Sequence, residues 1–145
     1  MTDRSEQFLR LSSRLTGFGA FDLRGTGMLA DYLAALEARL PANVLDELLA
    51  HGDDADDQAI GAILADPKLG PVARNIILLW YCGTWNALGA SWSAACGAIA
   101  DDKNAVISAA AYQAGLQWTV AGAHPAGAAQ QGFGAWSLAP GASPQ

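Results

Sequence analysis

One stretch of the sequence, residues 71–85 (PVARNIILLWYCGTW), constrains the fold of the whole chain. Pro71 suits the first helical position, where its missing N–H costs nothing, and Gly83 ends the apolar run. The six consecutive residues 76–81 are apolar or aromatic, so a helix here has no face reserved for water. Because such a helix belongs in a core, we expect the rest of the chain to pack around residues 72–81.

Apolar residues recur at spacings of three and four before this stretch, which predicts amphipathic surface helices. The first helix begins at Asp3, whose spacing to Glu6 fits a capping box, and ends at Gly17. The second begins at the cap residue Thr26 and runs until a proline stops it. A short third helix ends at Gly52, where glycine fits a left-handed cap.

The C-terminal part is less regular. Residues 86–100 are rich in Ala, Gly and Ser and can be helix or loop, whereas a further helix is expected from the cap residue Asn104 to about Gly122, with Gly115 as a weak point. Residues 122–145 hold five Gly and three Pro and indicate an extended tail that packs on the domain or on a partner. We therefore expect a single all-α domain of five or six helices, with no sheet larger than a short hairpin.

Charged residues are distributed unevenly. The 145-residue chain has a net charge of −6, which argues against nucleic acid or an anionic membrane as a partner, because both recruit clusters of Lys and Arg. Only Asp101, Asp102 and Lys103 are charged after residue 74. Since a self-sufficient soluble domain needs charged surface all round, the C-terminal half is either wrapped by the first half or covered by a partner.

A membrane span is not expected. Residues 75–100 form an uncharged stretch of 26 residues, but glycines and polar side chains interrupt it. Its continuous apolar part is about eight residues, well short of the ~20 that a spanning helix needs. The N-terminus shows neither a signal peptide nor a twin-arginine pair.

Residues for an active site are sparse. The only histidines are His51 and His124, and nothing in the sequence brings either close to a nucleophile. Cys82 and Cys96 are too few for a disulfide framework; they can pair with each other, pair with a partner, or stay buried as thiols. The acidic run 53–57 lacks the order of a calcium loop and fits a helix start. No glycine-rich phosphate loop is present, so we expect no catalytic residue, cofactor or metal in this chain.

Four strings of residues carry a family resemblance. They are FLRLSSRLTGF at 8–18, LLWYCGTW at 78–85, AYQAGLQW at 111–118 and GAHPAGAAQQGFGAW at 122–136. In this order and spacing they resemble the small subunit of the membrane-associated, FAD-dependent sugar and polyol dehydrogenases of the sorbitol, glucose and fructose dehydrogenase type. The resemblance spans nearly the whole chain, from Phe8 to Trp136.

The resemblance implies a non-catalytic accessory subunit that binds a large flavoprotein of the glucose-methanol-choline oxidoreductase type and assists its maturation and export. FAD and the catalytic residues then belong to that partner, with a haem c subunit as a further component. Members of the family commonly carry a twin-arginine signal, which this sequence lacks. The expected location is the periplasm, or the membrane through partners, if a signal was removed, and otherwise the cytoplasm. Cys82 stands where Thr is expected, so no polar role is carried to that position.

The expected interface lies in the C-terminal half, because buried aromatic residues dominate contacts between subunits. Its proposed members are Trp85, Trp92, His124, Pro125, Phe133 and Trp136. One alternative stays open at this point. It is a self-contained helical domain that homo-oligomerises or binds a small apolar ligand between its helices.

Overall fold

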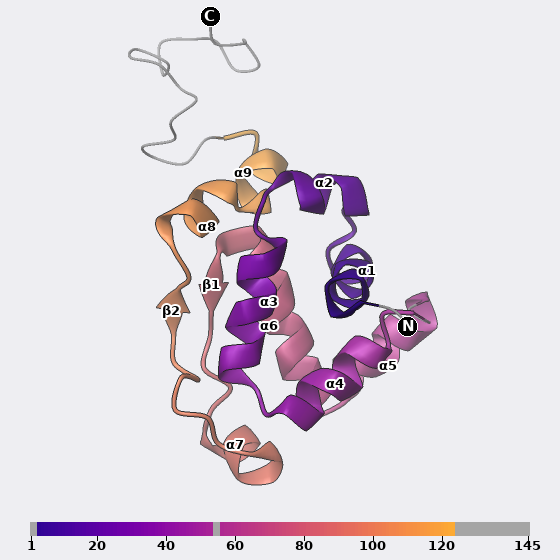
Figure 1. Ribbon diagram of the computed structural model, residues 1–145, viewed down its shortest axis with the longest axis vertical. Helices are drawn as coiled ribbons and strands as arrows, with labels where there is room; N and C mark the ends of the chain where they lie inside the picture. The colour runs from indigo at the N-terminus through magenta and orange to yellow at the C-terminus, as the bar shows by residue number, and fades with distance from the viewer. Residues whose placement is uncertain (1–2, 54–55, 124–145) are drawn as a thin grey trace, which may run out of the picture.

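Helix α6 (Leu69–Cys82) runs through the middle of the molecule, and the other elements pack around it (Figure 1). The computed structural model describes residues 3–53 and 56–123. Within that part, α6 contacts helices from both halves of the chain, namely α1, α5, α8 and α9, and also strand β1. The prediction of a central apolar helix is confirmed.

The described elements are mostly helical, as expected for an all-α fold. Two strands of two residues each, β1 and β2, pair antiparallel with Thr84 opposite Val106. In chain order the elements are α1 (Arg4–Thr16), α2 (Ala20–Gly25), α3 (Leu29–Arg39), α4 (Ala42–Ala50), α5 (Asp57–Ala65), α6 (Leu69–Cys82), β1 (Thr84–Trp85), α7 (Ala90–Cys96), β2 (Ala105–Val106), α8 (Ala109–Ala114) and α9 (Leu116–Ala121).

Three aromatic rings fill the centre of the core. Trp80 of α6 stacks on Phe8 of α1 with 6.1 Å between ring centroids, and meets Tyr32 of α3 edge-on at 4.9 Å. All three side chains are at most 1% exposed. Burying apolar side chains of this size contributes about 1.5–3 kcal/mol each, so these rings join α1, α3 and α6 into one packed unit.

The start of α6 differs from the prediction. The helix begins at Leu69, which places Pro71 inside the first turn and not at its first position. The cause is Asp66, whose carboxylate accepts the backbone N–H groups of Lys68 at 2.7 Å and Leu69 at 2.9 Å. Because these N–H groups would otherwise lack partners, the helix can begin two residues earlier.

The N-terminal half contains an additional helix. Helix α2 (Ala20–Gly25) occupies a segment expected to be a simple link, and Thr26 follows it instead of capping the next helix. Thr26 Oγ1 donates to the carbonyl of Leu23 at 2.7 Å and accepts from the N–H of Met28 at 3.2 Å. It thus shapes the turn between α2 and α3 (Leu29–Arg39). Short helices of this kind raise the number of helices above the five or six expected.

Two predicted caps in the N-terminal half also differ. Asp3 precedes α1 but its side chain makes no capping hydrogen bond, and Glu6 pairs with Arg24 instead of completing a capping box. Gly52 is not in the left-handed region. A Cβ there would lie 2.4 Å from the carbonyl oxygen of Gln7, so this glycine is needed for the close approach of α4 to α1.

The C-terminal half is divided more finely than expected. Residues 86–100, which were unassigned, contain α7 (Ala90–Cys96). The single helix expected from Asn104 is instead strand β2 followed by α8 and α9, which meet at Gly115. Asn104 accepts the N–H of Ala87 with its side chain at 2.6 Å and so does not cap a helix. Ser108 caps α8, accepting from Ala111 at 3.0 Å.

Candidate functional site

Asp102 fixes the beginning of the C-terminal half against α6. Its carboxylate accepts the indole N–H of Trp85 at 2.8 Å and the backbone N–H of Leu88 at 3.0 Å. Trp85 is fully buried. Asp102, one of the three charged residues of the C-terminal half, is therefore used as a hydrogen-bond acceptor for N–H groups of the chain itself.

The two tryptophans expected at a partner interface lie inside the chain's own core. Trp85 is 0% exposed and Trp92 is 7% exposed, and the indole N–H of Trp92 donates to the carbonyl of Lys68 at 2.9 Å. In this conformation the chain itself encloses both rings, and a partner contact through them stays a proposal. The other expected interface residues lie outside the described part of the chain: His124, Pro125, Phe133 and Trp136.

The exposed apolar side chains were not recognised from the sequence. Phe21 of α2 is 89% exposed, Val120 of α9 is 65% exposed and Val106 of β2 is 58% exposed, and Tyr112 of α8 is 37% exposed. A lone Phe in a six-residue helix gives no periodic signal, which is why Phe21 passed unnoticed. These are the exposed large hydrophobic residues of the described part of the chain.

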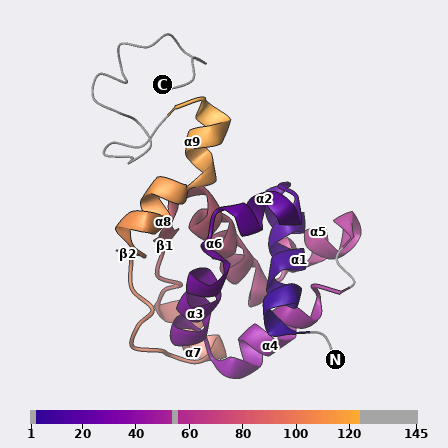
Figure 2. The ribbon, with the colours of Figure 1, turned by 45° about the horizontal axis from the view of Figure 1, so that its top comes forward.

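Most of them belong to one continuous uncharged segment. From residue 104 to residue 123 the chain has no Asp, Glu, Lys or Arg. We call this segment, which comprises β2, α8 and α9 with their links, the uncharged face. It lies across α6 from α4 and α5 in both views of the molecule (Figures 1 and 2). Helix α2, which carries Phe21, lies at the same end of the molecule as α9.

Two aromatic rings of the uncharged face hold each other in place. The rings of Tyr112 and Trp118 meet edge-to-face with centroids 5.4 Å apart. The indole N–H of Trp118 donates to the backbone carbonyl of Tyr112 at 2.8 Å. Since the polar edge of the indole is already satisfied, the exposed surface of this pair is available for apolar contact.

Two glycines bring the uncharged face close to α6. A Cβ at Gly83 would lie 2.6 Å from the backbone carbon of Ala111, and a Cβ at Gly115 would lie 2.5 Å from the carbonyl oxygen of Tyr81. Leu116 packs beside this contact and is 5% exposed. The uncharged face is therefore a rigid surface packed directly on the central helix.

The ion pairs of the described residues lie in the N-terminal half of the chain. They join Arg10 to Asp53 at 2.8 Å, Lys68 to Glu47, and Arg24 to Glu6, and Arg4 pairs with both Glu37 and Asp46. All of these residues are at least one-third exposed, so solvent screens each pair and its contribution to stability is small.

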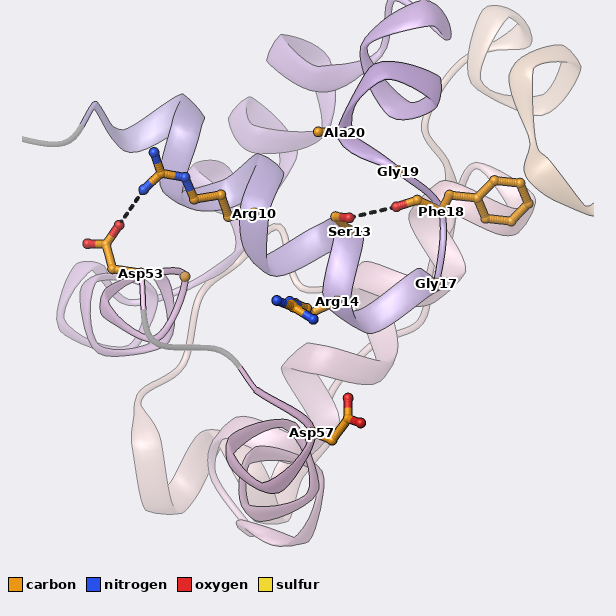
Figure 3. Close-up of a pocket in the computed structure, with 10 residues that line it drawn as sticks. Arg10, Ser13, Arg14, Gly17, Phe18, Gly19, Ala20, Asp53 and Asp57 are labelled. Atoms are coloured by element: carbon orange, nitrogen blue, oxygen red, sulfur yellow. Dashed lines mark hydrogen bonds and ion pairs between the residues drawn. The ribbon is translucent and has the colours of Figure 1, made fainter.

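A pocket of about 530 Å³ lies between the end of α1, the start of α2 and the link after α4 (Figure 3). Arg10, Arg14, Asp53 and Asp57 bring both signs of charge to its wall, and Arg10 is already paired with Asp53. Figure 3 shows the ring of Phe18 directed away from the other labelled side chains. The lining contains neither His nor Cys, and the hydroxyl of Ser13 donates to the backbone carbonyl of Phe18 at 2.7 Å.

The candidate catalytic and metal-binding groups are not assembled in the described residues. Both cysteines are free thiols, and Cys82 contacts the side chain of Gln117 at 3.7 Å. Within residues 3–53 and 56–123 no cluster of His, Cys, Asp and Glu could hold a metal ion. Asp56 caps α5 by accepting the N–H of Ala59 at 2.7 Å, which is the helix start predicted for the acidic run.

The core also contains a few buried polar groups without partners. Among the described residues, the Tyr32 hydroxyl and the Trp80 indole N–H have no hydrogen-bond partner, and neither has Ser12 Oγ. Burial raises the pKa of the Tyr32 hydroxyl, and the charges of Asp31 and Cys82 raise it further. The phenol therefore stays neutral at ordinary pH and cannot act as a base.

No described helix has both the length and the apolar character needed to cross a bilayer. The described residues also lack the parallel sheet and glycine-rich strand-to-helix turn that bind dinucleotides in doubly wound folds.

The chain was compared with known protein families, curated proteins and solved structures. The model of a protein family described as membrane-bound FAD-containing D-sorbitol dehydrogenase matches residues 1–122. No curated protein and no solved structure matches the chain. Three of the four strings that carry the resemblance fall within the matched residues, and the string at 122–136 begins where the match ends.

Proposed function

The chain belongs to the family of membrane-bound FAD-containing D-sorbitol dehydrogenases, and from this premise we propose that it is a non-catalytic accessory subunit of such an enzyme. It binds the large, flavin-carrying subunit, of the glucose-methanol-choline oxidoreductase type, and assists its maturation. The observation that carries the proposal is the exposed, uncharged face of β2, α8 and α9. Surfaces of this kind on a soluble chain are typical of protein contacts.

FAD belongs to the large subunit in this proposal. The family description includes FAD, yet the described residues offer neither a dinucleotide-binding turn nor a cluster of catalytic groups. A flavin dehydrogenase needs groups that contact both the flavin and the sugar, and in this proposal a second polypeptide supplies them. A haem c subunit is a further expected component of the complex.

The complex associates with the membrane through its other components. This proposal is supported by the family description as membrane-bound. The site of action is the periplasm or the membrane if a signal was removed, and otherwise the cytoplasm.

Co-expression tests the proposal. The affinity-tagged chain is produced with a large flavin-binding oxidoreductase encoded beside its gene, and the large subunit is also produced alone. We expect the two chains to co-purify in equal amounts, and the soluble, FAD-loaded yield of the large subunit to rise when both are present. Failure to co-purify, with equal yields of loaded large subunit, contradicts the proposal. A stable homodimer of this chain, found in place of the complex, would favour the alternative of a self-contained helical domain that homo-oligomerises.

A further inference from the structure

Three exposed apolar side chains lie on helices at one end of the molecule. Phe21 is on α2, Tyr112 on α8 and Val120 on α9, and both views place these helices at the same end (Figures 1 and 2). We name these three side chains the docking patch. We propose that the large dehydrogenase subunit binds at the docking patch. This inference rests on the proposed function and specifies where the contact is made.

The charges around the patch favour a protein partner over a lipid surface. The uncharged face supplies no Lys or Arg. Near Phe21, Arg24 is paired with Glu6 and Arg10 with Asp53, and Arg14 lines the pocket that Ala20 also lines. The whole chain carries a net charge of −6. Interfacial helices that bind anionic membranes need cations on their polar side, so this patch fits an uncharged protein surface.

The position at which the described chain ends points the same way. The structure describes the chain up to Ala123, two residues after α9. The 22 residues that follow contain no charged side chain and include Phe133 and Trp136. The uncharged sequence thus continues from the docking patch, and a large partner can contact both together.

One member of the patch is held in place before binding. Tyr112 contacts Trp118, and α8 and α9 approach α6 closely at Gly83 and Gly115. Less freedom of Tyr112 is therefore lost on association, which favours affinity. A rigid aromatic side chain surrounded by apolar neighbours is also typical of interface hot spots.

The test compares two double variants with the same change of charge. Phe21→Glu/Val120→Glu alters the docking patch, and Ala62→Glu/Ala65→Glu alters exposed alanines of α5 on the opposite side. Each is produced as the full chain, and its affinity for the large subunit is measured by titration. We expect the patch variant to bind at least tenfold more weakly and the α5 variant to bind within twofold of the wild type.

Each outcome decides between the two proposals. If the wild type binds and the patch variant binds equally well, the docking patch is wrong and the accessory role stands. If the wild type does not bind, both proposals fail. Phe21→Ser alone, at a side chain that is 89% exposed, gives a variant whose fold is not at risk, and it should weaken binding several-fold.

Two further measurements test whether a lipid surface or a second copy of this chain occupies the docking patch. Wild-type chain is mixed with vesicles of phosphatidylglycerol and phosphatidylcholine, and its mass is measured by sedimentation at several concentrations. We expect neither vesicle binding nor dimerisation. Either behaviour, abolished by Phe21→Glu/Val120→Glu, would overturn the assignment of the patch to the large subunit.

Discussion

Replacing Gly115 by Ala tests how closely α8 and α9 pack on α6. The new Cβ would lie 2.5 Å from the carbonyl oxygen of Tyr81, whereas ordinary Cβ contacts begin at 3.4 Å. The backbones must therefore separate by about 0.9 Å, the difference between these two distances. The obstacle is a main-chain atom, so no side-chain rotamer change can relieve it.

Two effects of opposite sign set the free-energy cost of this separation. Overpacking in a dense region costs about 1–3 kcal/mol. Gly115 has φ −57° and ψ 132°, which alanine adopts without strain. Because alanine lowers the conformational entropy of the unfolded chain, this effect raises the free energy of unfolding by about 0.4–1 kcal/mol. We expect Gly115→Ala to lower the free energy of unfolding by about 1–2 kcal/mol.

Gly61→Ala is the matched control, because it makes the same chemical change where a Cβ meets nothing within 4 Å. Gly61 lies inside α5 (Asp57–Ala65), where alanine is more favourable than glycine by about 0.5–1 kcal/mol. Urea unfolding of both variants should shift the midpoint in opposite directions at an unchanged slope. If Gly115→Ala is as stable as Gly61→Ala, the uncharged face is not packed on α6 as described.

Three other predictions concern the core and pH. Trp80→Ala should lower the free energy of unfolding by ~3–5 kcal/mol, because the ring contacts both Phe8 and Tyr32; a loss below 1 kcal/mol in chemical denaturation would refute this packing. Asp102→Ala should lower the free energy of unfolding by about 1–3 kcal/mol, because the N–H groups of Trp85 and Leu88 lose their acceptor. An unshifted midpoint of urea unfolding would contradict this prediction. The N–H groups of Leu69 and Lys68 lower the pKa of Asp66 below its ordinary 3.8, so its stabilising effect is full above pH 3.8 and is lost as the pH falls through the folded-state pKa. Melting curves of Asp66→Asn should accordingly depend less on pH in this acidic range than those of the wild type, and parallel pH dependences would count against the Asp66 contacts.

The central helix could be predicted from sequence because its signal is local. Six adjacent apolar or aromatic residues leave a helix no polar face, and Gly83 ends it in the left-handed region as expected. The uneven distribution of charge was equally visible. It left two arrangements open, a C-terminal half wrapped by the first half or covered by a partner, and the second stays a prediction.

The placement of Trp85 and Trp92 could not be predicted in the same way. Each indole is held by a partner distant in sequence, Asp102 for the first and the Lys68 carbonyl for the second. Aromatic residues suit cores and interfaces equally well, so composition alone cannot assign them to either. The division of the last helix at Gly115 likewise depends on its approach to Tyr81, a contact across 34 positions that no local pattern encodes.

Helix α2 and its exposed Phe21 were missed for a different reason. Six residues give fewer than two helical turns, too few for apolar periodicity to be recognised. The docking patch is therefore a property of the folded chain, since it combines α2 with α8 and α9 from the other end of the sequence.

The absorbance spectrum of the two separated subunits tests the central claim most directly. The complex is purified, its chains are separated under native conditions, and the flavin band of each is compared with its protein absorbance. The account predicts a flavin band in the large subunit near full occupancy and none in this chain. A stoichiometric flavin band in the isolated chain would contradict the accessory role.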